Sequence, residues 1–397
     1  MIVKTTKYKT NVISLRFMET LAKENLGLRA FLPNVVISKS PLYDSRKKLN
    51  EALDDLYGAT LLGRTFRQGL QSIIEISITF INHKFTTEPL LENVLKLLKD
   101  VVFNHKNLSK TEFLIEKKIA KEKILAFQNN KTSYALNRMF EIMFEGDNQS
   151  LMSIGKLEDI ENVSYNQMNN YYKKFIKSDY DVLISGDFKD SDIKLINSYF
   201  KGTNTKVELI DYVNKKPNYK EVVEHDKISQ AKVNIGYLLP VRYKDEEFYQ
   251  AAIFNILFGG DVHSRLFLNV REKHSLCYYV RSQYEPFKGF IYVYSGIDKA
   301  RVKLALEVID EQLNDLKKNL VSDQELIYSK QSYINSLKEA EDSQNRQLDA
   351  FYLKEVLNLD SIDEMIKKVN AVTKEQVQKM ARKLTKDTLY ILAPEEM

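Results

Sequence analysis

Four places in the chain carry the same signal for the start of a helix, and they fall into two pairs. In this capping box a Ser or Thr is followed three residues later by Glu or Gln, and each side chain accepts a hydrogen bond from the other residue's backbone amide. The boxes are Ser109–Glu112, Ser164–Gln167, Ser322–Glu325 and Thr373–Gln376. The spacing from the first box to the third is nearly the same as that from the second to the fourth. Two pairs at nearly one spacing, each flanked by apolar residues that suit a hydrophobic staple, indicate an internal repeat.

The segments around the boxes repeat as well. Alternating apolar residues are typical of a half-buried strand. They lie at 13–17, 74–78, 233–237 and 290–294, and short apolar runs that also suit strands lie at 182–184 and 391–393. A row of apolar residues with helical spacing returns in the second half at nearly the spacing of the boxes. Its members are Leu90, Val94, Leu95 and Val102 in the first half, and Leu304, Val308, Ile309 and Leu316 in the second.

Each half therefore consists of strand, helix, strand, several helices and a final strand. Short strands with a helical second part are typical of an α+β fold. We expect two homologous repeats, each a mostly antiparallel sheet covered by helices. The predicted domains are an N-terminal repeat over 1–200, a linker over 201–219 that is rich in Lys and Asn and contains Gly202 and Pro217, and a C-terminal repeat over 220–397.

The composition argues against several functional classes. The 59 basic and 54 acidic residues leave a net charge of +5, too small over 397 residues to indicate nucleic-acid binding. Lysines between 106 and 123 alternate with glutamates, as on a solvated helix face. No apolar run approaches the roughly 18 residues of a membrane span, and no signal sequence follows Met1. Because Cys277 is the sole cysteine, no intrachain disulfide can form, which favours a reducing, cytoplasmic setting.

The usual patterns of several catalytic centres are also missing. None of the five histidines lies three to five residues from another, so no helix can present a histidine pair to a metal. Their surroundings are rich in lysine and glutamate, so we expect the histidines on loops and at solvated edges. Gly259-Gly260-Asp261 is not followed by Gly-Lys-Ser/Thr, which predicts a tight turn and not a phosphate-binding loop. Cys277 lies in an apolar, strand-like run, whereas a reactive thiolate needs a basic or helix-terminal setting, so we predict a buried, inert thiol. An independent hydrolase would need an unfamiliar site.

One segment is distinctive. It contains Ser264-Arg265-Leu266-Phe267, then Arg271-Glu272-Lys273 and Leu276-Cys277-Tyr278. This order, with seven residues from Arg271 to Tyr278, resembles the signature of the second domain in the pitrilysin/insulinase family of zinc metallopeptidases. The family is built from two α+β repeats, so the resemblance extends over the whole chain. The length is similar to that of the small bacterial members, which pair as two chains.

The resemblance implies a clamshell whose repeats enclose a peptide, which lies as an added strand on a sheet edge. It implies catalytic contacts from Arg271 and Tyr278 to the peptide backbone, made in trans at a partner's site, and substrate binding by Ser264, Arg265 and Phe267. A structural alternative stays open for the first two residues. They would then be an arginine that ends a helix and a tyrosine in a strand core, both kept only for folding.

The resemblance also shows what this chain lacks. Active relatives carry His-x-x-Glu-His on the first helix, and the alignment places Ala30 and Asn34 at the histidines and Pro33 at the glutamate. Alanine offers a metal no lone pair, and proline carries no acid. Glu116 falls where a distal glutamate ligand would lie, and without the histidines we predict a surface carboxylate. We therefore expect no cofactor in this chain and zinc in a partner subunit.

These observations favour a non-catalytic subunit of a heterodimeric, insulinase-like zinc peptidase. The chain would be inactive alone and would contribute to the endopeptidase activity of its partner. The expected partners are a peptide substrate and a homologous zinc-bearing chain, or a second copy in a homodimer, and neither nucleic acid nor a membrane. The alternative is a peptide-binding or scaffold protein of the same fold with no role in proteolysis.

Overall fold

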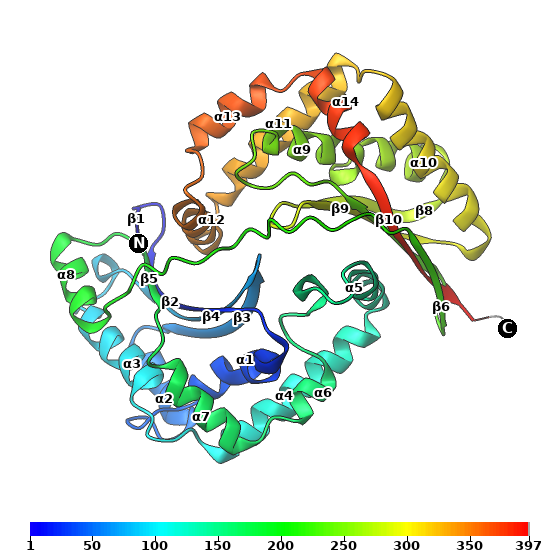
Figure 1. Cartoon of the computed structure of the whole chain (residues 1–397). Coiled ribbons are helices and arrows are strands. Elements are labelled where there is room, and N and C mark those ends of the chain that lie inside the picture. The colour runs from blue at the N-terminus through cyan, green and yellow to red at the C-terminus, as the bar shows by residue number, and fades with distance from the viewer. Residues whose placement is uncertain (396–397) are drawn as a thin grey trace. The chain divides into compact units, whose positions relative to one another are not determined.

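The structure is a computed structural model that describes residues 1–395. Contacts divide the chain into two compact units, each with one five-stranded sheet (Figure 1). Unit 1 comprises Met1–Ala126, Leu151–Glu208 and Ser343–Val356. Unit 2 comprises Phe127–Ser150, Leu209–Asp342 and the chain from Leu357 onward. Each unit thus combines most of one repeat with a short segment of the other.

The two sheets have the same strand order, which confirms the predicted α+β repeats. The order is β1-β5-β2-β4-β3 in unit 1 and β6-β10-β7-β9-β8 in unit 2. The pairs β1–β5 and β6–β10 are parallel, and all other neighbours are antiparallel. The strands of unit 1 are β1 (Ile2–Lys4), β2 (Thr10–Thr20), β3 (Thr60–Gln68), β4 (Gln71–Ile81) and β5 (Asp181–Gly186). Those of unit 2 are β6 (Lys220–Asp226), β7 (Ala231–Leu238), β8 (Cys277–Glu285), β9 (Phe290–Ile297) and β10 (Thr385–Pro394).

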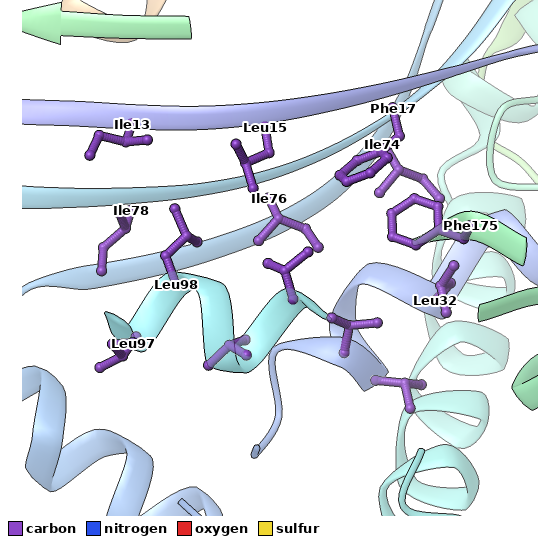
Figure 2. Close-up of a cluster of buried hydrophobic side chains, with 14 of the residues drawn as sticks. Ile13, Leu15, Phe17, Leu32, Ile74, Ile76, Ile78, Leu97, Leu98 and Phe175 are labelled. Atoms are coloured by element: carbon purple, nitrogen blue, oxygen red, sulfur yellow. The ribbon is translucent and has the colours of Figure 1, made fainter. Parts of the chain in front are cut away.

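Most helices of each unit cover one face of its sheet, which we call the inner face; the opposite face is the outer face. In unit 1, Ile13, Leu15 and Phe17 of β2 point with β4 residues toward Leu98 of α3 and Leu32 of α1 (Figure 2). Burying one such side chain contributes roughly 1.5–3 kcal/mol, so this layer supplies much of the stability of the unit. The helices over the inner face of unit 1 are α1 (Lys23–Val36), α2 (Arg46–Asp55), α3 (Leu91–Phe103), α4 (Lys110–Asn129), α6 (Leu157–Glu161), α7 (Tyr165–Phe175) and α8 (Asp190–Tyr199). Those of unit 2 are α9 (Phe248–Asn255), α10 (Val302–Lys318), α11 (Asp323–Ala340), α13 (Ile362–Ala371) and α14 (Lys374–Lys383).

The predicted helix starts occur as expected, with two differences of detail. Complete capping boxes start α7, α11 and α14. At α4 the Ser109 hydroxyl accepts from the amide of Glu112 (3.3 Å), but Arg46 binds the Glu112 carboxylate. In the predicted apolar row Leu304 is 48% exposed, because the buried stripe of α10 begins one residue later, at Ala305.

A lysine contact recurs at the repeat spacing. Lys117 of α4 donates to the carbonyls of Glu161 and Val163 (2.8 and 2.7 Å), at the end of α6. Lys330, which holds the same place in α11, donates to the carbonyl of Asn370 near the end of α13 (2.7 Å). Both lysines satisfy carbonyls that a helix end leaves unpaired, and desolvation lowers the pKa of each. Lys117 is thus an exception to the predicted solvated lysine face.

The outer face of each sheet carries one helix from the other repeat. α5 (Lys131–Met143) packs on β7 and β10 of unit 2, where Met139 and Met143 join an apolar cluster. α12 (Gln344–Leu357) brings Leu348 and Tyr352 to the outer face of the unit 1 sheet. The sequence patterns did not predict this exchange. The boundaries 1–200 and 220–397 stay a prediction for the repeats along the chain, and the compact units depart from them at these two helices.

α12 also meets a cluster of buried charges in unit 1. Arg16, which is 1% exposed, pairs with Glu75 (3.2 Å) and with Asp349 of α12. Arg64 pairs with the same two carboxylates, and Ser14 donates to Glu75 (2.6 Å). Burial alone would raise the pKa of Glu75, but the charges of the two arginines and the Ser14 hydrogen bond outweigh it, so the pKa is lowered. The cluster therefore holds Glu75 ionised inside the protein.

Candidate functional site

The Ser-Arg-Leu-Phe segment starts a short π-helix, η4 (Phe267–Lys273). Ser264 is 1% exposed, and its hydroxyl accepts a hydrogen bond from the amide of Phe267 (3.3 Å). Arg265 forms ion pairs with Asp315 of α10 (2.6 Å) and with Glu325 of the α11 capping box. Substrate binding by Ser264 and Arg265 stays a prediction, but their contacts within unit 2 favour a role in holding η4 in place.

A tight turn closes η4 and leads directly into β8. The amide of Leu276 donates to the carbonyl of Val270 (2.9 Å), and that of Ser275 to the carbonyl of Arg271 (3.0 Å). Ser275 has φ 51°, in the left-handed region. Each bond spans one residue more than its equivalent in the Schellman motif of an α-helix, as suits the end of a wider π-helix, and Val270 and Leu276 are both buried. The turn fixes where β8 begins relative to η4.

The glycine pair before the signature lies in a helix. α9 continues as a second π-helix, η3 (Ile256–Gly260), so the predicted tight turn at Gly259-Gly260 is wrong. A β-carbon at Gly259 would lie 2.8 Å from Ser282 Oγ and 2.9 Å from Leu266 Cδ1. Glycine therefore lets η3 pack closely on β8, a packing requirement that sequence alone does not distinguish from a turn.

Arg271 has its side chain at the surface of η4, where it is 43% exposed. Its guanidinium lies over the ring of Phe267, 4.7 Å from the centroid, one helical turn earlier. Within residues 1–395 its one ion pair is a loose contact with the neighbouring Glu272 (3.7 Å). The ring orients the guanidinium by a cation–π contact and leaves N–H donors for another acceptor. The structure thus places Phe267 as a support for Arg271, and its predicted contact with substrate stays untested.

Tyr278 is the extra residue of a β-bulge. Cys277 pairs with Ile297 and Tyr279 with Gly296, so Tyr278 has no partner in the ladder. Bulges re-aim side chains at sheet edges, and β8 is the outer strand of its sheet. The Tyr278 side chain is 63% exposed, and its hydroxyl makes no hydrogen bond in the described part of the chain. Tyr278 is therefore not the core tyrosine of the structural alternative.

The first repeat contains the same arrangement of a Ser-Arg pair, a short helix and a closing turn, which we call the frame. Ser45 accepts from the amide of Lys48 (3.3 Å) at the start of α2, and Arg46 binds Glu112 (2.7 Å), the capping-box glutamate of α4. The same pair of bonds closes α2, from the amide of Ala59 to the carbonyl of Leu53 (3.0 Å) and from that of Gly58 to the carbonyl of Asp54 (3.3 Å), with Tyr57 (φ 58°) and Gly58 (φ 73°) in the left-handed region. Ser45-Arg46 of the first repeat thus corresponds to Ser264-Arg265 of the second.

Arg271 and Tyr278 have no counterparts of similar chemistry in that frame. When the two repeats are aligned on their closing turns, Asp54 takes the place of Arg271 and Leu61 that of Tyr278. The frame of the first repeat closes with these residues, so a guanidinium and a phenol are not required to build it.

The lost zinc motif lies on α1, where the residues do not fit a metal. Ala30 and Asn34 are half-buried, and Pro33 is buried inside the helix. Pro33 has no N–H to bond the carbonyl of Arg29, and the hydroxyl of Thr65 on β3 donates to that carbonyl instead (2.6 Å). α1 is thus built around its proline, and none of the three positions can act as the histidine or glutamate of the motif.

Glu116 is not the surface carboxylate that we predicted. It is 6% exposed, because Arg46 reaches over α4 and binds both Glu116 (2.6 Å) and Glu112. No group of three or more His, Cys, Asp or Glu in residues 1–395 is arranged to hold a metal ion. The guanidinium of Arg46 supplies the positive charge that balances these two carboxylates.

Two smaller expectations need adjustment. Cys277 is half-buried and not buried, and burial raises the pKa of its thiol although Ser295 and Arg271 act in the opposite direction. His105 does not lie at a solvated edge, since its ring is bonded to the carbonyls of Val36 and Val101, and burial lowers its pKa. A raised thiol pKa agrees with the predicted lack of reactivity. No helix in the described chain is long and apolar enough to span a bilayer.

Two α+β repeats, a complete second-domain signature and a first helix without metal ligands define a metallopeptidase-like protein without its zinc site. A family model described as peptidase M16 inactive domain matches residues 162–333. The chain is 30% identical to the probable inactive metalloprotease YmfF of Bacillus subtilis, over 98% of this chain and 94% of that protein. It therefore belongs to the M16 peptidase family, which confirms the resemblance seen in the signature.

Two further comparisons agree with this assignment. The uncharacterized zinc protease YmxG, also of Bacillus subtilis, is 26% identical over 76% of this chain and 75% of its own length. The crystal structure of a conserved protein from Enterococcus faecalis V583 is 26% identical and covers 99% of this chain and 96% of its own, with a TM-score of 0.92. The fold of the whole chain, and not one repeat alone, is thus shared with a solved structure.

A metal analysis tests the loss of the zinc site. Because Ala30, Pro33 and Asn34 replace the ligands and base, the purified, tag-free chain is expected to contain far less than one zinc per molecule. Elemental analysis after dialysis measures this directly. About one tightly bound zinc per chain would contradict the expectation and would require ligands from outside α1.

Proposed function

We propose that this chain is the non-catalytic subunit of a two-chain zinc peptidase. It helps to enclose a peptide, and it presents Arg271 and Tyr278 to substrate bound at the zinc site of a homologous partner. The observation that carries the proposal is that both side chains are exposed, although the equivalent frame of the first repeat closes without them. The zinc-motif positions of the same chain have meanwhile lost every ligand.

The chemistry of the two side chains suits a peptide backbone. A guanidinium offers planar N–H donors to a carbonyl oxygen, and a phenol adds one O–H donor. Such donors stabilise the negative charge that gathers on a carbonyl oxygen when it is attacked. β8 is an outer strand, so a peptide can pair along it as an added strand. Neither side chain can start hydrolysis, which agrees with a chain that is inactive alone.

The relatives give separate support. One bacterium, Bacillus subtilis, has both a relative called a probable inactive metalloprotease and one called a zinc protease. A cell with both kinds of chain has the two components that the proposal needs. The proposal includes a bacterial cytoplasm as the setting, in keeping with the sole cysteine of this chain.

Reconstitution tests the proposal. This chain, a zinc-bearing homologue from the same cell and an equimolar mixture of both are each incubated with a peptide library. We expect cleavage by the mixture and little by either chain alone, together with a mixed pair in gel filtration. Zinc removal from the partner is the control and should abolish cleavage.

Two outcomes would contradict the proposal. In one, the chains do not associate. In the other, the partner cleaves equally well without this chain. Association without any gain in cleavage would favour the alternative, a peptide-binding or scaffold protein of the same fold. A single species of twice the chain mass, formed by this chain alone, would point to a homodimer.

A further inference from the structure

Unit 2 contains a cavity of about 200 Å³ whose charged lining residues are all cations. They are Lys215, Arg242, Lys288 and Lys383, and no Asp or Glu lines the cavity. A water molecule takes up roughly 30 Å³ of liquid, so the space can hold a small ion with several waters. None of the lining residues belongs to η4 or β8, and the proposed function makes no use of the cavity.

Arg242 is the cation whose charge is not matched. It is 5% exposed, and Nε and Nη2 donate to the carbonyl of Asp211 and to the side-chain oxygen of Asn214, both at 2.6 Å. Both acceptors are neutral. Asp245 accepts from the backbone N–H of Arg242 (2.7 Å), and within residues 1–395 no carboxylate forms an ion pair with the guanidinium. A buried charge without a counter-ion is costly, so this arrangement favours an anion beside the guanidinium.

The three lysines are each bound to a carboxylate that does not line the cavity. Lys288, 4% exposed, pairs with Asp147 (2.6 Å) and Asp211. Lys215 pairs with the fully buried Asp387, and Lys383 shares Glu247 with Lys379, so that this carboxylate serves two ammonium groups. The lysines are thus fixed in position by these carboxylates, while the cavity itself contains no negative charge.

We propose that this cavity binds a small oxyanion of the phosphate type, with Arg242 as its main donor. A guanidinium presents paired N–H groups that match two oxygens of such an ion. Lys383 adds positive charge at the wall, and Asn214 and Thr385 add neutral polar groups. Phosphate carries more than one negative charge at neutral pH, which suits a wall with several cations better than a single carboxylate does.

The bound ion would also hold the linker. Asn214 and Lys215 belong to the 201–219 segment, whereas Arg242 and Lys383 belong to the body of unit 2. An oxyanion in contact with both would join the linker to the body. Trypsin cleavage after Lys215 therefore provides a second readout of binding.

The test uses the purified full chain in phosphate-free buffer at constant ionic strength. Inorganic phosphate is expected to raise Tm saturably, to bind at one site per chain in a calorimetric titration and to slow cleavage after Lys215. Arg242→Met should weaken binding at least tenfold, and Arg242→Lys should weaken it less. Arg281→Met is the matched control, because Arg281 is an exposed arginine of β8 outside the cavity, and it should bind like the wild type. If Arg242→Met does not fold, Lys383→Met, at a partly exposed wall position, should still weaken binding.

The choice of anions makes each outcome decisive. Phosphate that acts no better than chloride, or binding that survives both Arg242→Met and Lys383→Met, would overturn the proposal. Acetate as effective as phosphate would overturn the phosphate-type assignment. Glycerol phosphate that binds more tightly than inorganic phosphate would identify a phosphate monoester as the source, and the reverse order would identify the free ion.

Discussion

Replacing Arg271 with alanine is expected to slow peptide cleavage by the mixed pair about 10²–10³-fold, and Tyr278→Phe should have an effect of similar order. Under the proposed function, each change removes a donor to a carbonyl oxygen that becomes more negative during attack. The effect should appear mainly in kcat, because such a bond strengthens as the charge develops. If both donors hold the same oxygen, the double variant should lose less than the product of the two single losses.

The control separates catalysis from assembly. Arg271 and Tyr278 are exposed residues of unit 2, so the variants should fold and join the partner as the wild type does, which gel filtration and thermal unfolding would show. Arg346→Ala removes an exposed arginine of α12, outside η4 and β8, and should leave kcat unchanged. Normal turnover by both Arg271→Ala and Tyr278→Phe in an intact pair would refute the catalytic contact and favour the scaffold alternative.

Replacing Glu75 with glutamine is expected to lower the free energy of unfolding of unit 1 by about 3–5 kcal/mol at pH 7. Glutamine keeps the shape of the side chain but leaves Arg16 and Arg64 with Asp349 as their shared carboxylate. Arg16 is almost fully buried, so it cannot recover the lost interaction from water. Urea unfolding followed by circular dichroism gives the change in midpoint.

The pH dependence identifies the cause. The folded protein lowers the pKa of Glu75, so this group stabilises the fold above its unfolded pKa near 4.5, and the contribution is lost as pH falls through the folded pKa. The difference between wild type and Glu75→Gln should therefore be largest at neutral pH and shrink in acid. Glu122→Gln on α4, an exposed glutamate, should stay within about 0.5 kcal/mol of the wild type. A difference that stays constant from neutral pH into strong acid would rule out a charge effect.

The repeat could be predicted because its signals are local. A capping box needs only Ser322 and Glu325, three residues apart, and the alternation of β2 needs only its own eleven residues. The exchange of α5 and α12 could not be predicted, because amphipathic helices do not specify which of two similar sheets they cover. Their placement depends on contacts such as Arg16 with Asp349, which join the start of one repeat to the second half of the other.

The candidate site was predicted only as far as its residue types. The signature located Arg271 and Tyr278. It did not indicate that Arg265 forms an ion pair with Glu325, or that Glu116 forms one with Arg46. The glycine pair Gly259-Gly260 suits a tight turn as well as the π-helix η3, so the sequence does not distinguish the two structures. The Ser-Arg pair occurs in both repeats, as Ser45-Arg46 and Ser264-Arg265, and this recurrence in the sequence indicates a shared structural role.

The exchanged helix α12 has a consequence for how the chain emerges from the ribosome. Unit 1 has most of its residues once Glu208 has been made, but Leu348 and Tyr352, which pack on Val12, Ile73 and Leu183 at the outer face of its sheet, come from residues 343–356. At roughly 5–20 residues per second, translation reaches that helix about 7–30 s later. During this interval the nascent unit displays an apolar sheet face and a charged cluster without Asp349. An exposed apolar face of this kind is prone to aggregation, and its lifetime is set by the speed of synthesis.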